Sequence, residues 1–256
     1  MRWLQYGLLY FILSLTVPAW AVDHNNLDEG HPLRVEDAYP LAYGELSTEV
    51  GVQAHHPRHG TDRVSFPLEL LYGAYWNLHV GIGTTLSTQP HSMNEGEKSG
   101  DVRIFGLYNV NQETLRLPAL ATKVSVTLPT GIDARRTDIG LMGIVTRSLS
   151  HGRIHLNVGY AFHKGAQNRG RSGEYEVVLG GQYPLAYPRS FTTSLLADVF
   201  TQPSPRVGGK QVTGVEVGIR HQVAPLTVVD MGIGSEVTGP SDRAIFFAIV
   251  GVSVGF

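Results

Sequence analysis

The sequence predicts an all-β chain that closes into a single antiparallel up-and-down transmembrane β-barrel of about twelve strands. Apolar residues alternate with polar or small residues over most of the 256 positions. The alternating segments mostly run for ten to thirteen residues, about twice the usual strand of a soluble sheet and close to the ~9–11 residues of a tilted membrane-spanning strand. The last segment, "AIFFAIVGVSVGF", is apolar on one face and ends on Phe256.

The first residues have the layout of a secretory signal peptide. The basic Arg2 precedes an apolar run that ends at Val17, and "AWA" supplies the small-x-small pattern after which signal peptidase cuts. The apolar run is too short to span a bilayer. We therefore expect residues 1–21 to be a signal peptide, residues 22–42 an N-terminal periplasmic segment, and residues 43–256 the barrel.

Composition excludes several classes for this exported chain. It has no cysteine, so it is not a disulfide scaffold. Its 20 basic and 22 acidic residues give no reason to expect nucleic acid as a partner. After the signal peptide no apolar run approaches the ~18 residues of a membrane helix. Any membrane that the chain crosses must be crossed by strands.

Each strand is predicted from its period-two pattern. In chain order, "ELSTEVGVQA", "WNLHVGIGTTL", "RIHLNVGYAF", "EYEVVLGGQY" and "VTGVEVGIRH" place apolar side chains on one face and charged, amide, histidine or glycine residues on the other. The segment containing "IGLMGIVTRS" is apolar on both faces. The twelve predicted segments lie near residues 44–55, 62–73, 75–87, 100–110, 118–128, 138–149, 153–163, 174–184, 190–201, 211–222, 225–237 and 244–256.

The connections alternate in length. Short connections such as "SHG", "AYP" and "VAP" alternate with long polar stretches such as "STQPHSMNEGEKSG" and "KGAQNRGRSG", and "NQETLRLP" is a longer exception among the short ones. Bacterial outer-membrane barrels have short periplasmic turns and longer outside loops. With both termini periplasmic, the long loops fall outside, so the pattern predicts the outer membrane of a Gram-negative bacterium.

The last strand indicates which solvent the apolar faces meet. A terminal strand ending on Phe256 resembles the signature that outer-membrane proteins present to their assembly machinery, and closure against the first strand removes its free edge. The expected partners are therefore outer-membrane lipid and that machinery. A soluble secreted sandwich or lipocalin-like barrel would bury the apolar face instead, and period two alone does not exclude it. The length and number of the segments favour the membrane barrel.

If the apolar faces meet lipid, the opposite faces line the lumen. Charged and histidine side chains of both signs fall there, with acids in excess. Such residues form either a water-filled channel or a network of internal salt bridges, and both interpretations stay open. The predicted lumen-lining residues are Glu45, Glu49, Glu69, His79, Asp101, Arg103, Lys123, His155, Glu174, Glu176, Asp198, Glu216, Arg220 and Asp230.

The sequence predicts neither an enzyme nor a cofactor. It contains no G-x-S-x-G elbow, no H-E-x-x-H motif and no glycine-rich phosphate loop after a strand. The stretch "HHPRH" places His55, His56 and His59 in one loop, and clustered imidazoles can bind zinc or copper. Pro57 interrupts the stretch and no helix fixes the rings, so a solvated loop is favoured over a metal site.

Several stretches resemble a known family. "HPLRVEDAYPLAYGELSTEVGV", "FPLELLYGAYWNLHVGIG", "SGDVRIFGLYNV", "PALATKVSVTLPTG" and "YEVVLGGQYPL" are similar to successive hairpins of the outer-membrane family named after the meta-pathway of phenol degradation. The resemblance covers the chain from about His31 to Phe256. It implies a transporter-like barrel, a channel for small and often aromatic or partly apolar molecules. The alternative is a non-conducting barrel with a structural or surface-interaction role.

Overall fold

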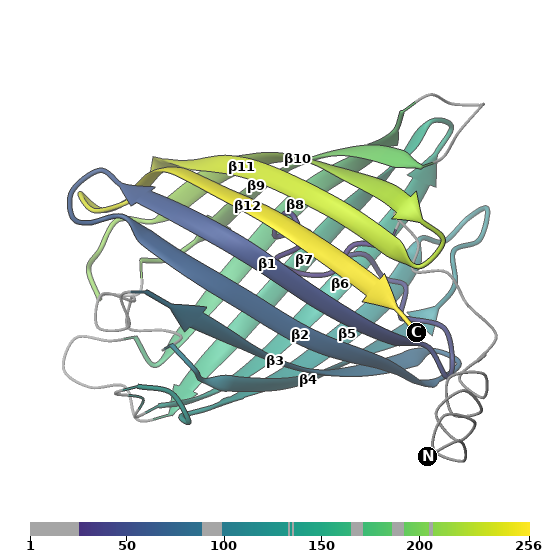
Figure 1. Cartoon of the computed structure of the whole chain (residues 1–256), viewed down its shortest axis with the longest axis horizontal. Helices are drawn as coiled ribbons and strands as arrows, with labels where there is room; N and C mark the ends of the chain where they lie inside the picture. Colours follow the sequence, from purple (N-terminus) through teal and green to yellow (C-terminus); the bar gives the residue numbers. More distant parts are fainter. Residues whose placement is uncertain are drawn as a thin grey trace, which may run out of the picture.

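The computed structural model describes residues 26–88, 99–132, 134, 136–164, 171–185, 192–204 and 207–256. In this part of the chain twelve strands close into one antiparallel barrel, in which each strand pairs with its sequence neighbours and β1 pairs with β12 (Figure 1). The predicted all-β barrel is confirmed. No helix among the described residues is long and apolar enough to cross a membrane. The strands are β1 (Leu46–Pro57), β2 (Arg63–Tyr75), β3 (Leu78–Ser87), β4 (Val102–Asn111), β5 (Ala119–Leu128), β6 (Thr137–Leu149), β7 (Gly152–Lys164), β8 (Gly173–Pro184), β9 (Thr193–Gln202), β10 (Val212–Ala224), β11 (Thr227–Thr238) and β12 (Ala244–Gly255).

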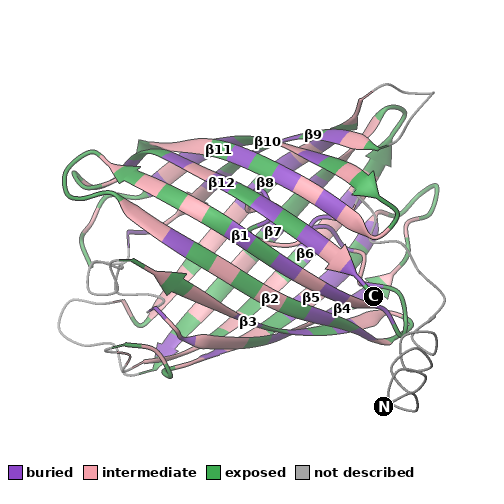
Figure 2. Cartoon of the chain, in the orientation of Figure 1, coloured by how far each residue is buried: buried purple, intermediate pink, exposed green. Residues whose placement is uncertain are grey.

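Burial alternates along the strands, because successive side chains point to opposite faces of a sheet (Figure 2). In β12, for example, Val250 and Val252 are exposed on the outside, whereas Gly251 and Ser253 are buried inside. Val252 also lies opposite Val50 of β1, so the first and last strands share one apolar outer face. The barrel is therefore apolar outside and mostly polar inside.

The two ends of the barrel differ in their connections. At the end where β1 begins and β12 ends, here called the terminal end, Phe256 N–H donates to Leu46 O at 2.8 Å, and three of the five connections have only two residues. At the opposite end, the loop end, the connections have five to fourteen residues. This is the predicted asymmetry, except that the connection over 185–192 is longer than expected. Much of the longest loops, including 89–98 and 165–170, lies outside the described residues.

Residues 27–42, here called the lumen segment, lie inside the barrel. They were expected to form a periplasmic segment, and this expectation is corrected. Leu27, Leu33 and Val35 are at most 3% exposed and pack with inward-facing residues of β8, β9, β10 and β12. Ala38 packs against residues of β4, β5 and β6. The segment enters because its apolar side chains are buried there and its charges meet partners on the wall.

Inward-facing glycines make room for this segment. At five of them an added Cβ would come within 3.1 Å of an atom of residues 31–35. A Cβ on Gly232 would lie 2.5 Å from the carbonyl oxygen of Pro32, and one on Gly180 would lie 2.9 Å from the Cβ of Val35. The segment therefore lies directly on backbone of the wall, where no side chain intervenes. These five glycines are Gly51, Gly180, Gly218, Gly232 and Gly251.

Candidate functional site in the barrel lumen

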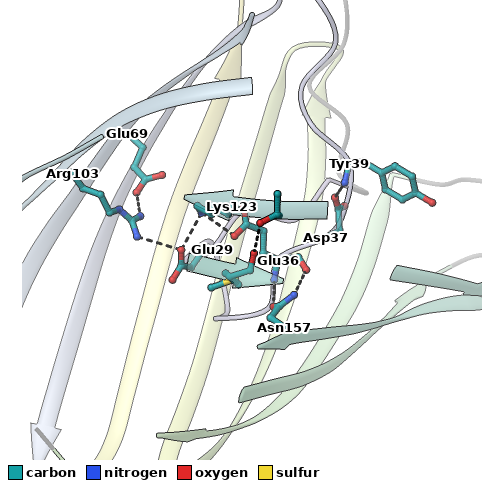
Figure 3. A network of polar contacts seen from close by, with 10 residues as sticks. Glu29, Glu36, Asp37, Tyr39, Glu69, Arg103, Lys123 and Asn157 are labelled. Atoms are coloured by element: carbon teal, nitrogen blue, oxygen red, sulfur yellow. Dashed lines mark hydrogen bonds and ion pairs between the residues drawn. The ribbon is translucent and has the colours of Figure 1, made fainter. Parts of the chain in front are cut away.

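A network of ion pairs joins the lumen segment to β2, β4 and β5 (Figure 3). The ammonium of Lys123 on β5 donates to both carboxylate oxygens of Glu36, at 2.8 and 3.0 Å, and to Glu29 at 3.0 Å. Arg103 on β4 reaches Glu29 at 3.3 Å and also pairs with Glu69 on β2. Two carboxylates of the segment thus neutralise two cations of the wall.

A second set of contacts lies on the side of β8 to β10. The guanidinium of Arg34, on the segment, lies 2.9 Å from Glu176 and 3.2 Å from Glu216, and the backbone amide of Arg34 donates to Glu216 at 2.8 Å. The same guanidinium lies 3.9 Å from the ring centroid of Phe200. The carboxylate of Asp198 accepts the next backbone amide of the segment at 3.2 Å. One arginine of the segment is therefore the shared ion-pair partner of two acids of this wall, Glu176 and Glu216.

Wall side chains also satisfy the backbone of the segment. Asn157 on β7 accepts from the amide of Glu36 and donates to its carbonyl, both at 2.8 Å. Asn109 on β4 donates to the carbonyl of Ala38 at 2.7 Å, and Thr146 on β6 accepts from its amide at 3.0 Å. Buried backbone groups need such partners, since leaving them unpaired is costly. The segment is thus bound by side chains and makes no strand pairing with the described wall.

All fourteen predicted lumen residues face the inside or lie at its rim. Glu69, Arg103, Glu174 and Glu176 are half-buried, and the others are buried. Nine of them are described above or contact the segment elsewhere, as Glu45 does by accepting the amide of Ala42 at 3.0 Å. Asp230 on β11 is buried and lies opposite Arg220 of β10 in the strand pairing. The remaining predicted residues bond to the wall or its loops: Asp101 accepts from Gly131 N–H at 2.9 Å, His155 bonds Thr146 at 3.0 Å, Glu49 accepts from Ser253 at 3.0 Å, and Glu174 lies 3.7 Å from His163.

The acidic residues of β8 to β10 are only partly brought together. Glu176, Asp198 and Glu216 meet at Arg34, whereas Glu174 lies apart, beside His163. Arg220 donates to the carbonyl of His31 at 3.2 Å.

Sequence reasoning missed the residues of the segment itself, Glu29, Arg34 and Glu36. The only signal for them was the mixture of buried-type apolar residues and charges in "HPLRVEDAY", which does not say where the segment lies.

Two groups of residues offer the ligand types of a metal site. Ligand atoms of Asp28, Glu36 and His79 lie within 4.8 Å of one another. The amide of Leu41 donates to Nδ1 of His79 at 3.3 Å, so in the neutral ring the other nitrogen carries the proton and has no lone pair for a metal. Lys123 already neutralises Glu36. A hydrogen-bonded ionic cluster therefore fits these residues better than a metal centre.

The three histidines expected in the first loop do not converge, because His55 and His56 lie on β1 and only His59 follows it. His55 stacks on the inward-facing Phe247, with ring centroids 5.5 Å apart, whereas His56 pairs with Asp62 at 2.6 Å. Neighbouring residues of a strand point to opposite faces, which separates the two rings. His59 is exposed. Among the described residues, these three rings do not form a cluster of metal-ligand atoms.

Burial perturbs one carboxyl group of the segment strongly. It raises the pKa of Asp37 to about 7, although the backbone amides of Tyr39 and Leu27 donate to this carboxylate at 2.8 and 3.1 Å. Its two hydrogen bonds tie the start of the segment at Leu27 to residues 37–39.

A cavity of about 320 Å³ lies between the lumen segment and the wall. Its lining mixes the ion pairs of Arg34 and Arg103 with apolar side chains such as Phe247 and Ile249. Arg34 and His55 also line a cavity of about 740 Å³ at the loop end. The lumen is thus hollow on the loop side of the segment and filled where the segment lies.

Solved structures of outer-membrane channels are similar to this chain. The COG4313 outer membrane channel from Pseudomonas putida F1 is 17% identical, with a TM-score of 0.64 over 90% of this chain and 100% of that chain. The chain has the fold of an outer-membrane barrel. The KdgM porin (8% identical, TM-score 0.56, 81% of this chain and 99% of that one) and the NanC porin (9%, 0.54, 82% and 98%) share it. No protein-family model and no curated protein matches the chain.

Proposed function

We propose that the protein is an outer-membrane channel for small molecules and that the lumen segment closes it in the state described. The observation that carries the proposal is the pairing of the wall charges. Lys123, Glu176 and Glu216 have their ion-pair partners on the segment. Non-covalent contacts of this kind keep the segment inside the lumen. A barrel built only as a structural element would pair such wall charges with one another.

Removal of the segment leaves a wall lined with unpaired polar groups. Buried charges without partners are costly, so water enters to solvate them. The result is a water-filled lumen like that of porins. The terminal end is then the periplasmic end and the loop end faces outward, in the outer membrane of a Gram-negative bacterium.

The lining of the cavity between the lumen segment and the wall indicates the kind of solute that the channel accepts. Its wall combines carboxylates and guanidinium groups with the apolar side chains of Phe247 and Ile249. Small ligand sites typically join apolar contact area to a few polar groups. We propose small, partly apolar solutes, which agrees with the resemblance to the phenol meta-pathway family.

The alternative is a non-conducting barrel. The extent of the buried network favours it, since Arg103 also pairs with Glu69 of the wall and the segment is bound from many sides. Conductance in planar bilayers separates the two. We expect the variant lacking residues 22–42 to conduct more than the full mature chain, and a folded deletion variant without conductance would favour the structural barrel.

A disulfide tests the closing role directly, because the chain has no cysteine of its own. The Cβ of Val35 lies 2.9 Å from the position of a Cβ on Gly180, near enough for a disulfide after a small adjustment toward the usual ~3.8 Å. In Val35→Cys/Gly180→Cys, oxidation is expected to abolish the openings and reduction to restore them. Each single cysteine variant is the control. Equal conductance of the oxidised and reduced protein would show that the lumen segment does not close the channel.

A further inference from the structure

The connection between β4 and β5, here called the 112–118 loop, presents an apolar tip at the terminal end. Leu115 is 98% exposed and Leu117 is 59% exposed, and Arg116 between them is also exposed. Three other connections at this end need only two residues, so the extra length is not required to reverse the chain. Adjacent exposed leucines of this kind often mark a surface that contacts another protein or a membrane.

The loop is held in one shape by hydrogen bonds. The guanidinium of Arg147 on β6 donates to three of its carbonyls, those of Thr114, Leu115 and Leu117, at 2.7, 2.9 and 3.2 Å. The hydroxyl of Thr114 accepts the amides of Arg116 and Leu117 at 3.3 and 3.0 Å. The backbone polar groups are thus used within the protein, and the leucine side chains are directed outward.

The position of Arg147 places this loop at the outer rim of the barrel. On β6, Ile144 and Thr146 are buried inside, at 1% and 0% exposure, so Arg147 lies on the alternate, outer face. Its charge is met by Glu113 at 3.3 Å, and Glu113 also accepts the amide of Ser148 at 2.9 Å. The guanidinium of Arg147 is therefore bonded to the loop and to Glu113, although it lies on the outer face.

The leucines continue the apolar outer surface of the barrel. Val110 at the end of β4 is 59% exposed, Leu120 at the start of β5 is 39% exposed, and Leu149 at the end of β6 is 56% exposed. A surface continuous with the lipid-facing belt, with the exposed cation of Arg116 beside it, fits the boundary between acyl chains and phosphate headgroups.

We propose that the 112–118 loop is an interfacial anchor, whose Leu115 and Leu117 insert into the phospholipid leaflet at the terminal end while Arg116 meets lipid phosphate. This inference rests on the membrane location in the proposed function, but it does not require conduction. The loop fixes the depth of this rim in the leaflet, because hydrogen bonds from Arg147 prevent the leucines from turning back toward the barrel.

Tryptophan fluorescence with brominated lipids tests the insertion. Trp76 is the only tryptophan after residue 21, so Trp76→Phe gives a background for single reporters. In that background Leu115→Trp is placed in vesicles whose phosphatidylcholine carries bromine either near the carbonyl end or near the methyl end of the acyl chain. We expect blue-shifted emission that loses most of its intensity with the shallow bromines and less with the deep ones.

Two further reporters are the controls. Val250→Trp, in the middle of the outer face of β12, reports embedding of the barrel and should be quenched by deep bromines. Val207→Trp, which lines the cavity at the loop end, should instead be quenched by aqueous iodide. If Val250→Trp is quenched by lipid while Leu115→Trp responds only to iodide, the loop faces water, as a protein-docking loop would, and the anchor is refuted. Without lipid quenching of Val250→Trp, the membrane location itself fails and the anchor with it.

Discussion

The substitution Gly232→Ala is expected to open the channel by displacing the lumen segment. The new Cβ would lie 2.5 Å from the carbonyl oxygen of Pro32, 3.0 Å from Cδ2 of Leu33 and 3.3 Å from Cγ2 of Ile249. The two shortest contacts are with the segment, and one of them is with its backbone, which cannot rotate away. The segment must therefore shift by about half an ångström or leave.

The size of the effect follows from the cost of overpacking. An extra methyl group in a closely packed site costs about 1–3 kcal/mol. If this cost falls on the closed state alone, the ratio of open to closed channels rises about 5-fold to about 150-fold. In the variant lacking residues 22–42 the two shortest contacts are absent and the next is 3.3 Å from the side chain of Ile249, so the same substitution should have little effect there.

Open probability in planar bilayers is the assay. Gly159→Ala on β7 is the matched control, because a Cβ there would meet Met142 and Leu141 at ordinary distances of 3.7 Å or more and no atom of the segment. Unchanged open probability in folded Gly232→Ala would refute the reasoning. So would an equal increase in the full chain and in the deletion variant, since the effect would then lie in the wall.

Three other predictions concern stability and binding of the segment. Val250→Arg on the lipid face should lower the free energy of unfolding by ~2–4 kcal/mol, and Val237→Arg near a strand end by only ~0–1 kcal/mol, measured by denaturant titration in lipid; equal costs would contradict the membrane depth. Lys123→Met should destabilise by ~3–5 kcal/mol in the same titration, because Glu36 stays buried without its cation, and adding Glu36→Gln should recover part of the loss. Asn157→Ala should speed hydrogen exchange of residues 27–42 more than that of the strands, since two backbone groups of Glu36 lose their partner. Equal acceleration in the segment and the strands would show that the substitution destabilises the barrel wall instead.

The sequence by itself determined the barrel. Alternation of side chains is a local property of the pleated backbone, and strand length is set by the thickness of the bilayer, so both can be read without knowing any contact. The outward position of Val250 and Val252 and the inward position of Ser253 follow from this rule. The asymmetry of the connections likewise indicated which end of the barrel carries the long loops.

Only the tertiary structure decided how the lumen is filled. The contact of Arg34 with Glu216 joins residues 182 positions apart, and no local pattern specifies such a pair. The segment over 138–149 is apolar on both faces because Met142 and Ile144 pack inside against Ala38 and Tyr39 of the lumen segment. Glycines such as Gly232 similarly look like ordinary strand residues in the sequence, and their role exists only because another part of the chain lies against them. Strand periodicity specifies which face a side chain occupies, whereas its partner depends on packing between distant segments.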